Sequence, residues 1–132
     1  PVWGAEFEKE ICKSPISLNL SRKPNLKYYS SDRISQYLGN GSCIFVDKNS
    51  RLEDLFTSDE VVYFDCEDLN EFGIKINYYL DNEDEAKRIA KKGWERGHKY
   101  YNEKIITKYF IDIALNGKAT QEYNWPLHTF KK

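Results

Sequence analysis

The sequence predicts an α/β domain of the partial Rossmann-like kind, a three-layer α/β/α arrangement with a short parallel sheet and several C-terminal helices. Short apolar runs alternate with amphipathic stretches along the first half of the chain, as in parallel strands joined by helical crossovers. Only three such runs are legible, fewer than a complete doubly wound sheet contains, and the chain has no Met, even at position 1. We therefore interpret the sequence as the C-terminal half of a larger domain, cut from a longer protein.

Three segments have the character of strands. Residues 16–20 alternate apolar and small polar side chains, which is typical of a half-buried strand. Residues 43–46 and 61–64 are short apolar runs flanked by Gly or acidic residues, and their length favours buried strands over helices. Between the last two, residues 52–56 have apolar side chains at helical spacing.

Two helices are expected before the second strand. Residues 4–13 place apolar and charged side chains on opposite sides, and Pro15 ends this short amphipathic run. Residues 33–41 follow, with Ser and Asp at positions 30–32 as candidate N-cap residues and Gly-Asn-Gly as a stop.

Three more helices are expected after the third strand. They cover residues 68–80, 83–101 with Asn82 as the cap, and 103–115. The apolar faces of the first two are expected to consist of Leu69, Phe72, Ile76 and Leu80, and of Ala86, Ile89, Ala90 and Trp94. Residues 1–115 thus form the predicted domain, and residues 116–132 form a tail that is aromatic enough to pack onto a neighbour.

Charge and composition argue against several partners. The chain has 20 Lys and Arg against 21 Asp and Glu, a net charge of −1, so it lacks the surplus of cations that nucleic acid binding requires. Basic and aromatic residues adjoin in three places, but on different elements. No apolar run approaches the roughly 18 residues of a membrane span, and we expect no basic-then-apolar leader before the domain. We expect neither nucleic acid nor membrane partners.

The cysteines and histidines do not form a metal site in the sequence. Cys12, Cys43 and Cys66 are an odd number at wide spacing, which favours buried, reduced thiols and a cytoplasmic setting. His98 and His128 lie far apart, and neither belongs to a cluster with ligand spacing. We interpret His98, beside Lys99, as a surface or helix-packing histidine, and we expect no metal cofactor.

Polar and positive side chains gather between the first strand and the next helix, over residues 19–36. In a parallel sheet, phosphates bind where strands end and helices begin, because free N–H groups and the helix dipole point outward there. The alternative is a helix cap, a surface ion pair and a solvated loop. The candidate residues are Ser21, Arg22, Lys27, Ser30, Ser31 and Arg33.

A series of motifs in fixed order gives the chain a family resemblance. It includes Val2-Trp3-Gly4, Leu18-Asn19-Leu20, Arg33-Ile34-Ser35-Gln36 closing at Gly41, Cys43 to Val46, Leu52-Glu53-Asp54-Leu55-Phe56, Val61 to Phe64, Tyr79-Leu80, Ile89-Ala90-Lys91-Lys92-Gly93 and His98. Over residues 2–115 this order resembles the C-terminal region of GT-B glycosyltransferases, in particular the CgeB-like group related to a spore-maturation protein.

The resemblance implies a function and a set of donor-binding residues. It implies a hexosyltransferase-like domain that binds a nucleotide-diphosphate sugar, inactive alone because the acceptor and any catalytic base come from the N-terminal GT-B domain. Catalytic residues within this chain are unknown. The implied donor-binding residues are Ser21, Arg22, Lys27, Ser31, Arg33 and Gln36, with the cations neutralising the diphosphate in place of a metal.

Two positions depart from the family pattern. Gln36 stands where the family commonly has a Glu that binds the ribose hydroxyls, and Tyr28 stands where the other Glu of an E-x7-E motif would be. A glutamine can bond a hydroxyl but carries no charge. These departures leave open a second interpretation, a non-catalytic α/β interaction module that kept the fold and lost the donor site.

Overall fold

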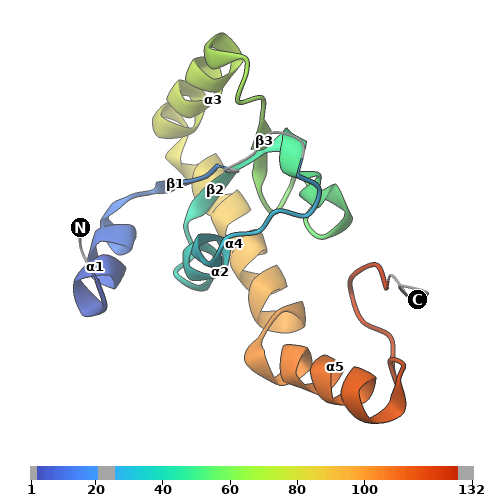
Figure 1. Ribbon diagram of the computed structural model, residues 1–132. Helices are drawn as coiled ribbons and strands as arrows, with labels where there is room; N and C mark the ends of the chain where they lie inside the picture. The colour runs from blue at the N-terminus through green and yellow to red at the C-terminus, as the bar shows by residue number, and fades with distance from the viewer. Residues whose placement is uncertain (1–2, 21–25, 128–132) are drawn as a thin grey trace.

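The computed structural model describes residues 3–20 and 26–127, which form three strands, five α-helices and two 3₁₀ turns (Figure 1). The prediction of an α/β fold with a short parallel sheet is confirmed. In chain order the elements are α1 (Ala5–Lys13), β1 (Ile16–Asn19), α2 (Asp32–Gly39), β2 (Cys43–Asp47), η1 (Lys48–Ser50), η2 (Leu52–Asp54), β3 (Val62–Phe64), α3 (Leu69–Asp81), α4 (Glu83–Tyr100) and α5 (Glu103–Asn116).

The sheet has the order β1-β2-β3, and both pairs are parallel. Asn19 is paired with Val46, and Phe45 with Val62. Strand β2 lies in the centre and is buried along its whole length, which explains why its apolar residues are continuous and do not alternate with polar ones. Because the strands are parallel, their carboxyl ends lie at the same edge of the sheet.

Alternate residues of β2 face two apolar clusters. Ile44 and Val46 face the first cluster, which includes Ile34 and Leu38 of α2, and Cys43 and Phe45 face the second, which includes Ile89 of α4. The remaining buried members are Leu52, Phe56 and Val61 in the first, and Val62, Phe64, Ala86 and Ala90 in the second. Helices therefore cover both faces, as a three-layer fold requires.

Helix α4 packs closely against Glu60 and Leu38 at Gly93. A Cβ atom there would lie 2.5 Å from the Glu60 carbonyl oxygen and 3.1 Å from Leu38 Cδ2. The buried side of the helix thus includes Gly93, whereas Trp94 is 42% exposed and stacks on His98 at 4.2 Å. The expectation that Trp94 belongs to the buried face is wrong. The side of α4 that packs against Glu60 and Leu38 is the side of Gly93, where no side chain fits, and Trp94 is turned away from it.

Helix α3 is also rotated relative to the expected apolar face. Phe72 and Tyr79 make edge-to-face contacts with Phe45, with centroids 6.1 and 5.7 Å apart. Leu69 and Leu80, expected to be buried, are 75% and 54% exposed. Aromatic rings bury more apolar area than leucine, and they determine which side of this short helix faces the sheet.

Two smaller expectations are corrected. The stretch with helical spacing, residues 52–56, is helical only as a 3₁₀ turn over Leu52–Asp54, which begins after Arg51, whose φ is 52°. All three cysteines are free, but only Cys43 is buried, Cys66 is half-buried and Cys12 is exposed. Burial raises the pKa of the Cys43 thiol to about 12.

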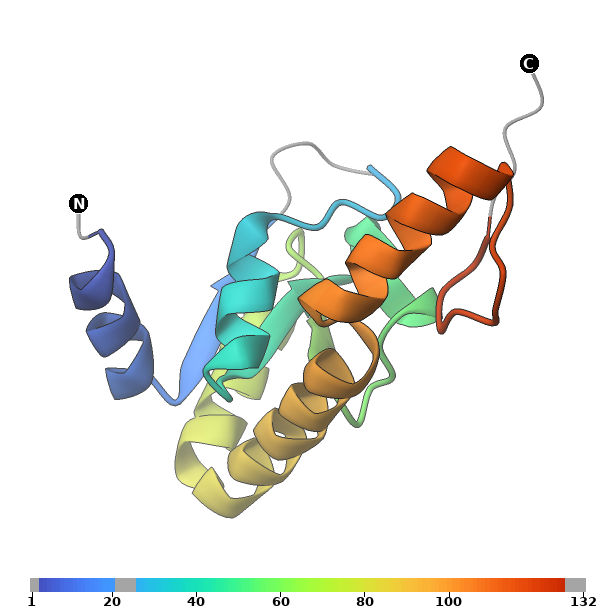
Figure 2. The same ribbon diagram turned by 90° about the horizontal axis from the view of Figure 1, so that it is seen from below.

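Helix α5 and residues 117–127, which we call the arm, project from the rest of the protein (Figure 2). The buried Asp112 carboxylate accepts hydrogen bonds from the hydroxyl groups of Thr120 and Tyr123 and from Lys108 Nζ. These bonds hold the pKa of Asp112 well below its usual range, although burial opposes the shift. The described part of the predicted aromatic tail therefore folds back on α5.

Aromatic rings connect the arm to the remainder of the chain, which we call the sheet body. The Trp125 ring lies 5.4 Å from Tyr109 of α5 and 6.0 Å from Tyr101 at the end of α4. The Tyr101 hydroxyl donates to the Leu55 carbonyl at 2.8 Å and contacts that of Asn124 at 3.2 Å. Tyr101 is thus the main link between the two parts.

Candidate donor site at the carboxyl edge of the sheet

A fully buried asparagine ends the first strand. The Asn19 side chain is 0% exposed, and its Oδ1 accepts a hydrogen bond of 2.9 Å from Ser31 Oγ. Its Nδ2 atom has no hydrogen-bond partner within the described residues. A buried polar group without a partner is costly, and in native proteins it frequently indicates a functional site.

Two residues at the start of α2 continue this network. Ser31 occupies the N-cap position, but its side chain makes no capping hydrogen bond to the helix and is directed to Asn19 instead. Arg33 Nε donates to Ser31 Oγ at 3.2 Å, and its Nη2 donates to the Leu20 carbonyl at 3.3 Å. The half-buried guanidinium is therefore held where β1 ends and α2 begins.

The chain before α2 brings a second cation near this edge. Lys27 Nζ lies 3.7 Å from Asp54 Oδ2 and 4.4 Å from the centre of the Tyr28 ring. The hydrogen bond with Tyr28 and the proximity of Asp54 raise the pKa of Lys27. The Tyr28 hydroxyl also donates to Asp54, and Tyr28 has a φ of 61°, an uncommon value for a residue with a side chain. This strained residue stands where the family pattern has a Glu.

The six residues predicted for the donor site are placed unequally. Ser31 and Arg33 lie together with Asn19, whereas Lys27 lies beside Asp54. Gln36 is exposed one turn further along α2, and its side chain makes no hydrogen bond within the described part of the chain. Ser21 and Arg22 lie outside the described residues.

The ends of β2 and β3 add polar groups that the sequence analysis did not single out. Asp47 is 2% exposed, and its Oδ1 accepts from the backbone N–H of Asn49 at 3.0 Å. The Asn49 amide also lies 3.7 Å from Cys66 Sγ, and burial, followed by hydrogen bonding to Asp47, raises the Cys66 pKa. Asp47 directly follows the apolar run of β2. This position in the sequence was the signal that could have identified it as a candidate site residue.

This edge is suited to an anion more than to a metal. The Arg33 guanidinium, the Asn19 amide and the N-terminus of α2 are neighbours in the structure. Groups of these three kinds stabilise negatively charged oxygen atoms. In residues 3–20 and 26–127, no group of three His, Cys, Asp or Glu side chains could hold a metal ion.

Comparison with known families determines the broader identity of the chain. A family model described as glycosyl transferase-like matches residues 1–111, most of the chain. The chain belongs to this glycosyl transferase-like family. The resemblance stated above is thereby confirmed for a glycosyltransferase-like domain. No curated protein and no solved structure matches the chain.

In residues 3–20 and 26–127, no helix of this glycosyl transferase-like chain is both long and apolar enough to span a bilayer.

Proposed function

We propose that this chain is the donor-binding part of a GT-B glycosyltransferase of the CgeB-like kind, and that it binds the diphosphate of a nucleotide sugar. The network of Asn19, Ser31 and Arg33 is the observation that supports this most directly. Its amide has an unused N–H group, and its guanidinium is fixed at the start of a helix. The family membership adds the reaction class.

The chemistry assigned to these residues follows from the charge that develops during sugar transfer. The bond between the anomeric carbon and the diphosphate oxygen breaks, an acceptor hydroxyl attacks that carbon and loses its proton, and the diphosphate leaves with more negative charge. Arg33 would neutralise this charge, and the buried Asn19 would hold Ser31, and through it Arg33, in position. Because Arg33 is already held by Ser31 and Leu20, little reorganisation is needed.

The acceptor and the catalytic base would come from an N-terminal GT-B domain of the same cytoplasmic protein, so that this chain alone transfers no hexose.

The second candidate function is an interaction module that has lost the donor site. Gln36 and Tyr28 favour it, because each replaces a carboxylate expected from the family pattern.

An amide-resolved NMR titration separates the two candidates. The chain is titrated with UDP, GDP, ADP, CMP and their common sugar conjugates. Shifts confined to residues 19–20 and 26–36 for one nucleotide support the donor site and identify its base. A folded chain that responds to none of them supports the interaction module.

Arg33→Ala tests the assigned cation. Removing a charge-assisted phosphate bond is expected to cost about 1.5–3 kcal/mol of nucleotide binding, a loss of roughly ten- to a hundredfold in affinity. Arg88→Ala is the matched control, since Arg88 is paired with Glu85 and Asp59, remote from this edge. Equal affinities for both variants would remove Arg33 from the site.

A further inference from the structure

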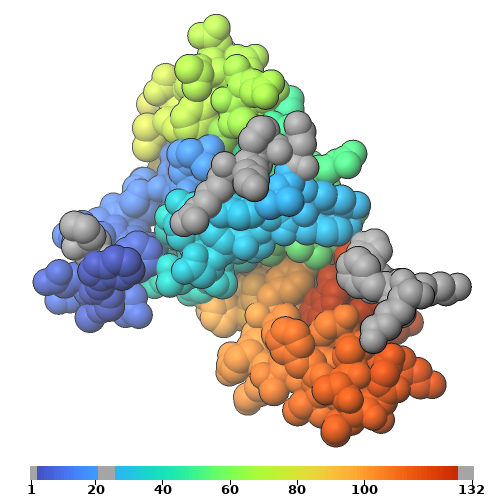
Figure 3. Space-filling view, in the orientation of Figure 1, coloured from blue at the N-terminus to red at the C-terminus, as the bar shows by residue number. Residues whose placement is uncertain are grey.

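A cavity of about 340 Å³ lies between α2, the last turn of α4 and the start of α5. It borders a different side of α2 from the one that carries Arg33. Its floor is apolar and consists of Ile34 and Leu38 of α2 together with Leu55 and Phe56. In the space-filling view, the surface of α2 adjoins the orange surface of the α4–α5 corner (Figure 3).

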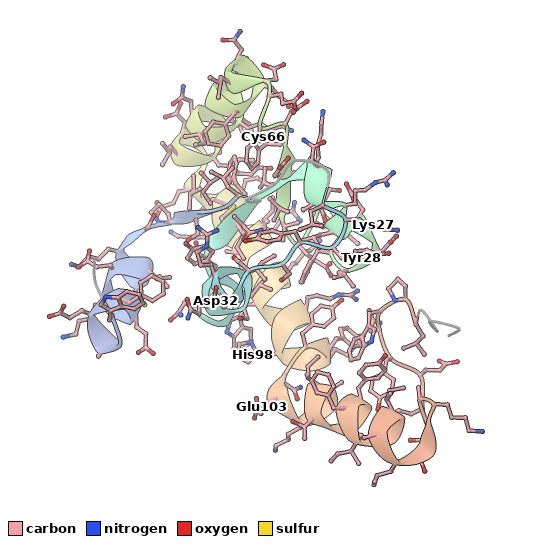
Figure 4. All side chains as sticks on the ribbon, viewed as in Figure 1. Lys27, Tyr28, Asp32, Cys66, His98 and Glu103 are labelled. Carbon is pink, nitrogen blue, oxygen red and sulfur yellow. The ribbon has the colours of Figure 1, made fainter. Side chains whose placement is uncertain are left out.

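Three polar side chains at the rim of this cavity have unused hydrogen-bonding capacity. They are Ser30, His98 and Glu103, and the last two lie at the corner where α4 gives way to α5 (Figure 4). Within residues 3–20 and 26–127, the Ser30 hydroxyl and the Glu103 carboxylate have no side-chain partner, and His98 is bonded through Nδ1 alone.

The contact of His98 determines what the rim can offer a ligand. Nδ1 lies 3.0 Å from the Trp94 carbonyl, which can only accept, so Nδ1 carries the proton. In the neutral ring Nε2 is then an acceptor. Stacking on the Trp94 ring at 4.2 Å fixes the orientation of the imidazole. With the Glu103 carboxylate also an acceptor, the rim requires a ligand that carries several O–H or N–H donors.

Charge and size narrow the ligand class further. Among the described residues that line the cavity there is no Lys or Arg, and Glu103 would repel a phosphate, so a nucleotide does not fit here. The volume is at the lower end of the range for ligand pockets, roughly 300–1,000 Å³, which suits a single ring. A pyranose has hydroxyl donors at its edge and a C–H face that can cover an apolar floor.

We propose that this cavity is a binding subsite for one neutral sugar ring. The hydroxyl groups of the ring donate to Glu103 and to His98 Nε2, one more bonds to Ser30, and the C–H face lies on Leu38 and Phe56. The subsite goes beyond the proposed donor function, because it carries no group for a diphosphate. It suits a sugar unit of an acceptor or of a glycan already formed.

The test is an amide-resolved NMR titration with methyl β-D-glucopyranoside, methyl β-D-galactopyranoside and N-acetylglucosamine. At least one is expected to shift the amides of Ser35, Gly39, Gly97 and Asn102, with a dissociation constant of about 1–10 mM. Glu103→Gln should weaken that binding about tenfold, because it replaces a charged acceptor. Glu122→Gln, an exposed carboxylate on the arm, is the control and should leave it unchanged.

A second variant blocks the cavity without a polar change. A Cβ atom on Gly39 meets nothing within 4 Å, and Gly39 is the last residue of α2, so Gly39→Leu is compatible with the fold. It should abolish the sugar-induced shifts.

Other outcomes would overturn the proposal. These are the absence of shifts with all three sugars, binding of phenol but of no sugar, and shifts of the same four amides by UDP alone. The first two leave the donor function intact if nucleotides still shift residues 26–36. Sugar binding without any nucleotide response would support the subsite and contradict the donor function.

Discussion

The sheet body and the arm are held together by different interactions. Strand β2 is buried on both faces between apolar clusters, and Phe45 in its middle is 0% exposed. The arm instead depends on the single carboxylate of Asp112, three polar groups around it and a stack of aromatic rings. Apolar burial in the sheet body is distributed over many residues, whereas the polar contacts of the arm all converge on the single charge of Asp112. The two parts should therefore respond separately to mutation.

The largest effect is expected in the body. Phe45→Ala removes a fully buried ring that contacts Phe64, Phe72 and Tyr79, and it should lower the free energy of unfolding by about 3–5 kcal/mol. Phe110→Ala is the matched control on the arm, where the ring is 66% exposed, and it should change stability by less than about 0.5 kcal/mol. Urea denaturation measures both, and similar losses would contradict the comparison.

Gly93→Ala should have the next largest effect, because its Cβ atom would lie 2.5 Å from the Glu60 carbonyl oxygen. We expect a loss of about 1–3 kcal/mol, despite the higher helix propensity of alanine. Gly73→Ala, in α3, meets nothing within 4 Å and should stabilise the protein by up to about 1 kcal/mol. A Gly93→Ala protein that is as stable as the wild type in thermal unfolding would mean that α4 can move away from Glu60.

Asp112→Ala tests whether residues 117–127 can be released from α5 while the sheet body stays folded. Thr120 and Tyr123 lose their shared acceptor, so residues 117–127 should detach from α5 while the body keeps its melting temperature. Hydrogen exchange at the Thr120 amide, which donates to Asp112 Oδ2 at 3.1 Å, should become about tenfold faster or more. Asp81→Ala, an exposed carboxylate at the end of α3, should leave that exchange rate unchanged. Unfolding of the whole chain by Asp112→Ala would refute a separate arm.

Acid should produce the smallest effect, and on the arm it acts through Asp112. The pKa of Asp112 is lowered in the folded chain, so the carboxylate contributes its full stabilisation above its unfolded pKa of about 4 and loses it as the pH falls further. The indole N–H signal of Trp125 should therefore be constant from about pH 8 to 5 and should change only below about pH 4. A change near pH 6 would implicate another group.

The sequence predicted the strands and helices well, because their patterns are local. The three strands lie within one residue of their expected positions, since short apolar runs between turn residues have few alternative structures. The orientation of α3 and of Trp94 was not predictable in this way. It depends on which side chains fit beside Phe45 and on the close approach of Gly93 to Glu60, and both are contacts between distant segments.

The candidate site was predictable as a region and not as a network. A strand followed by a helix start indicated residues 19–36, and Ser31 and Arg33 lie there as expected. The role of Asn19 became visible only when its burial and its unpaired Nδ2 were known. His98 and Glu103 border a cavity formed by α2, α4 and α5, and no spacing in the sequence brings those helices together.

The sequential order of the sheet also has a consequence for how the chain folds. Each strand pairs with the next one along the chain, and paired residues such as Ile16 and Cys43, or Phe45 and Val62, are fewer than 30 residues apart. Separations of this size cost less loop-closure entropy than pairing between the two ends of the chain would. Since β2 belongs to both pairs, it can act as the nucleus to which β1 and β3 attach independently. The parallel sheet can then form within one short stretch of polypeptide, without waiting for distant segments to meet.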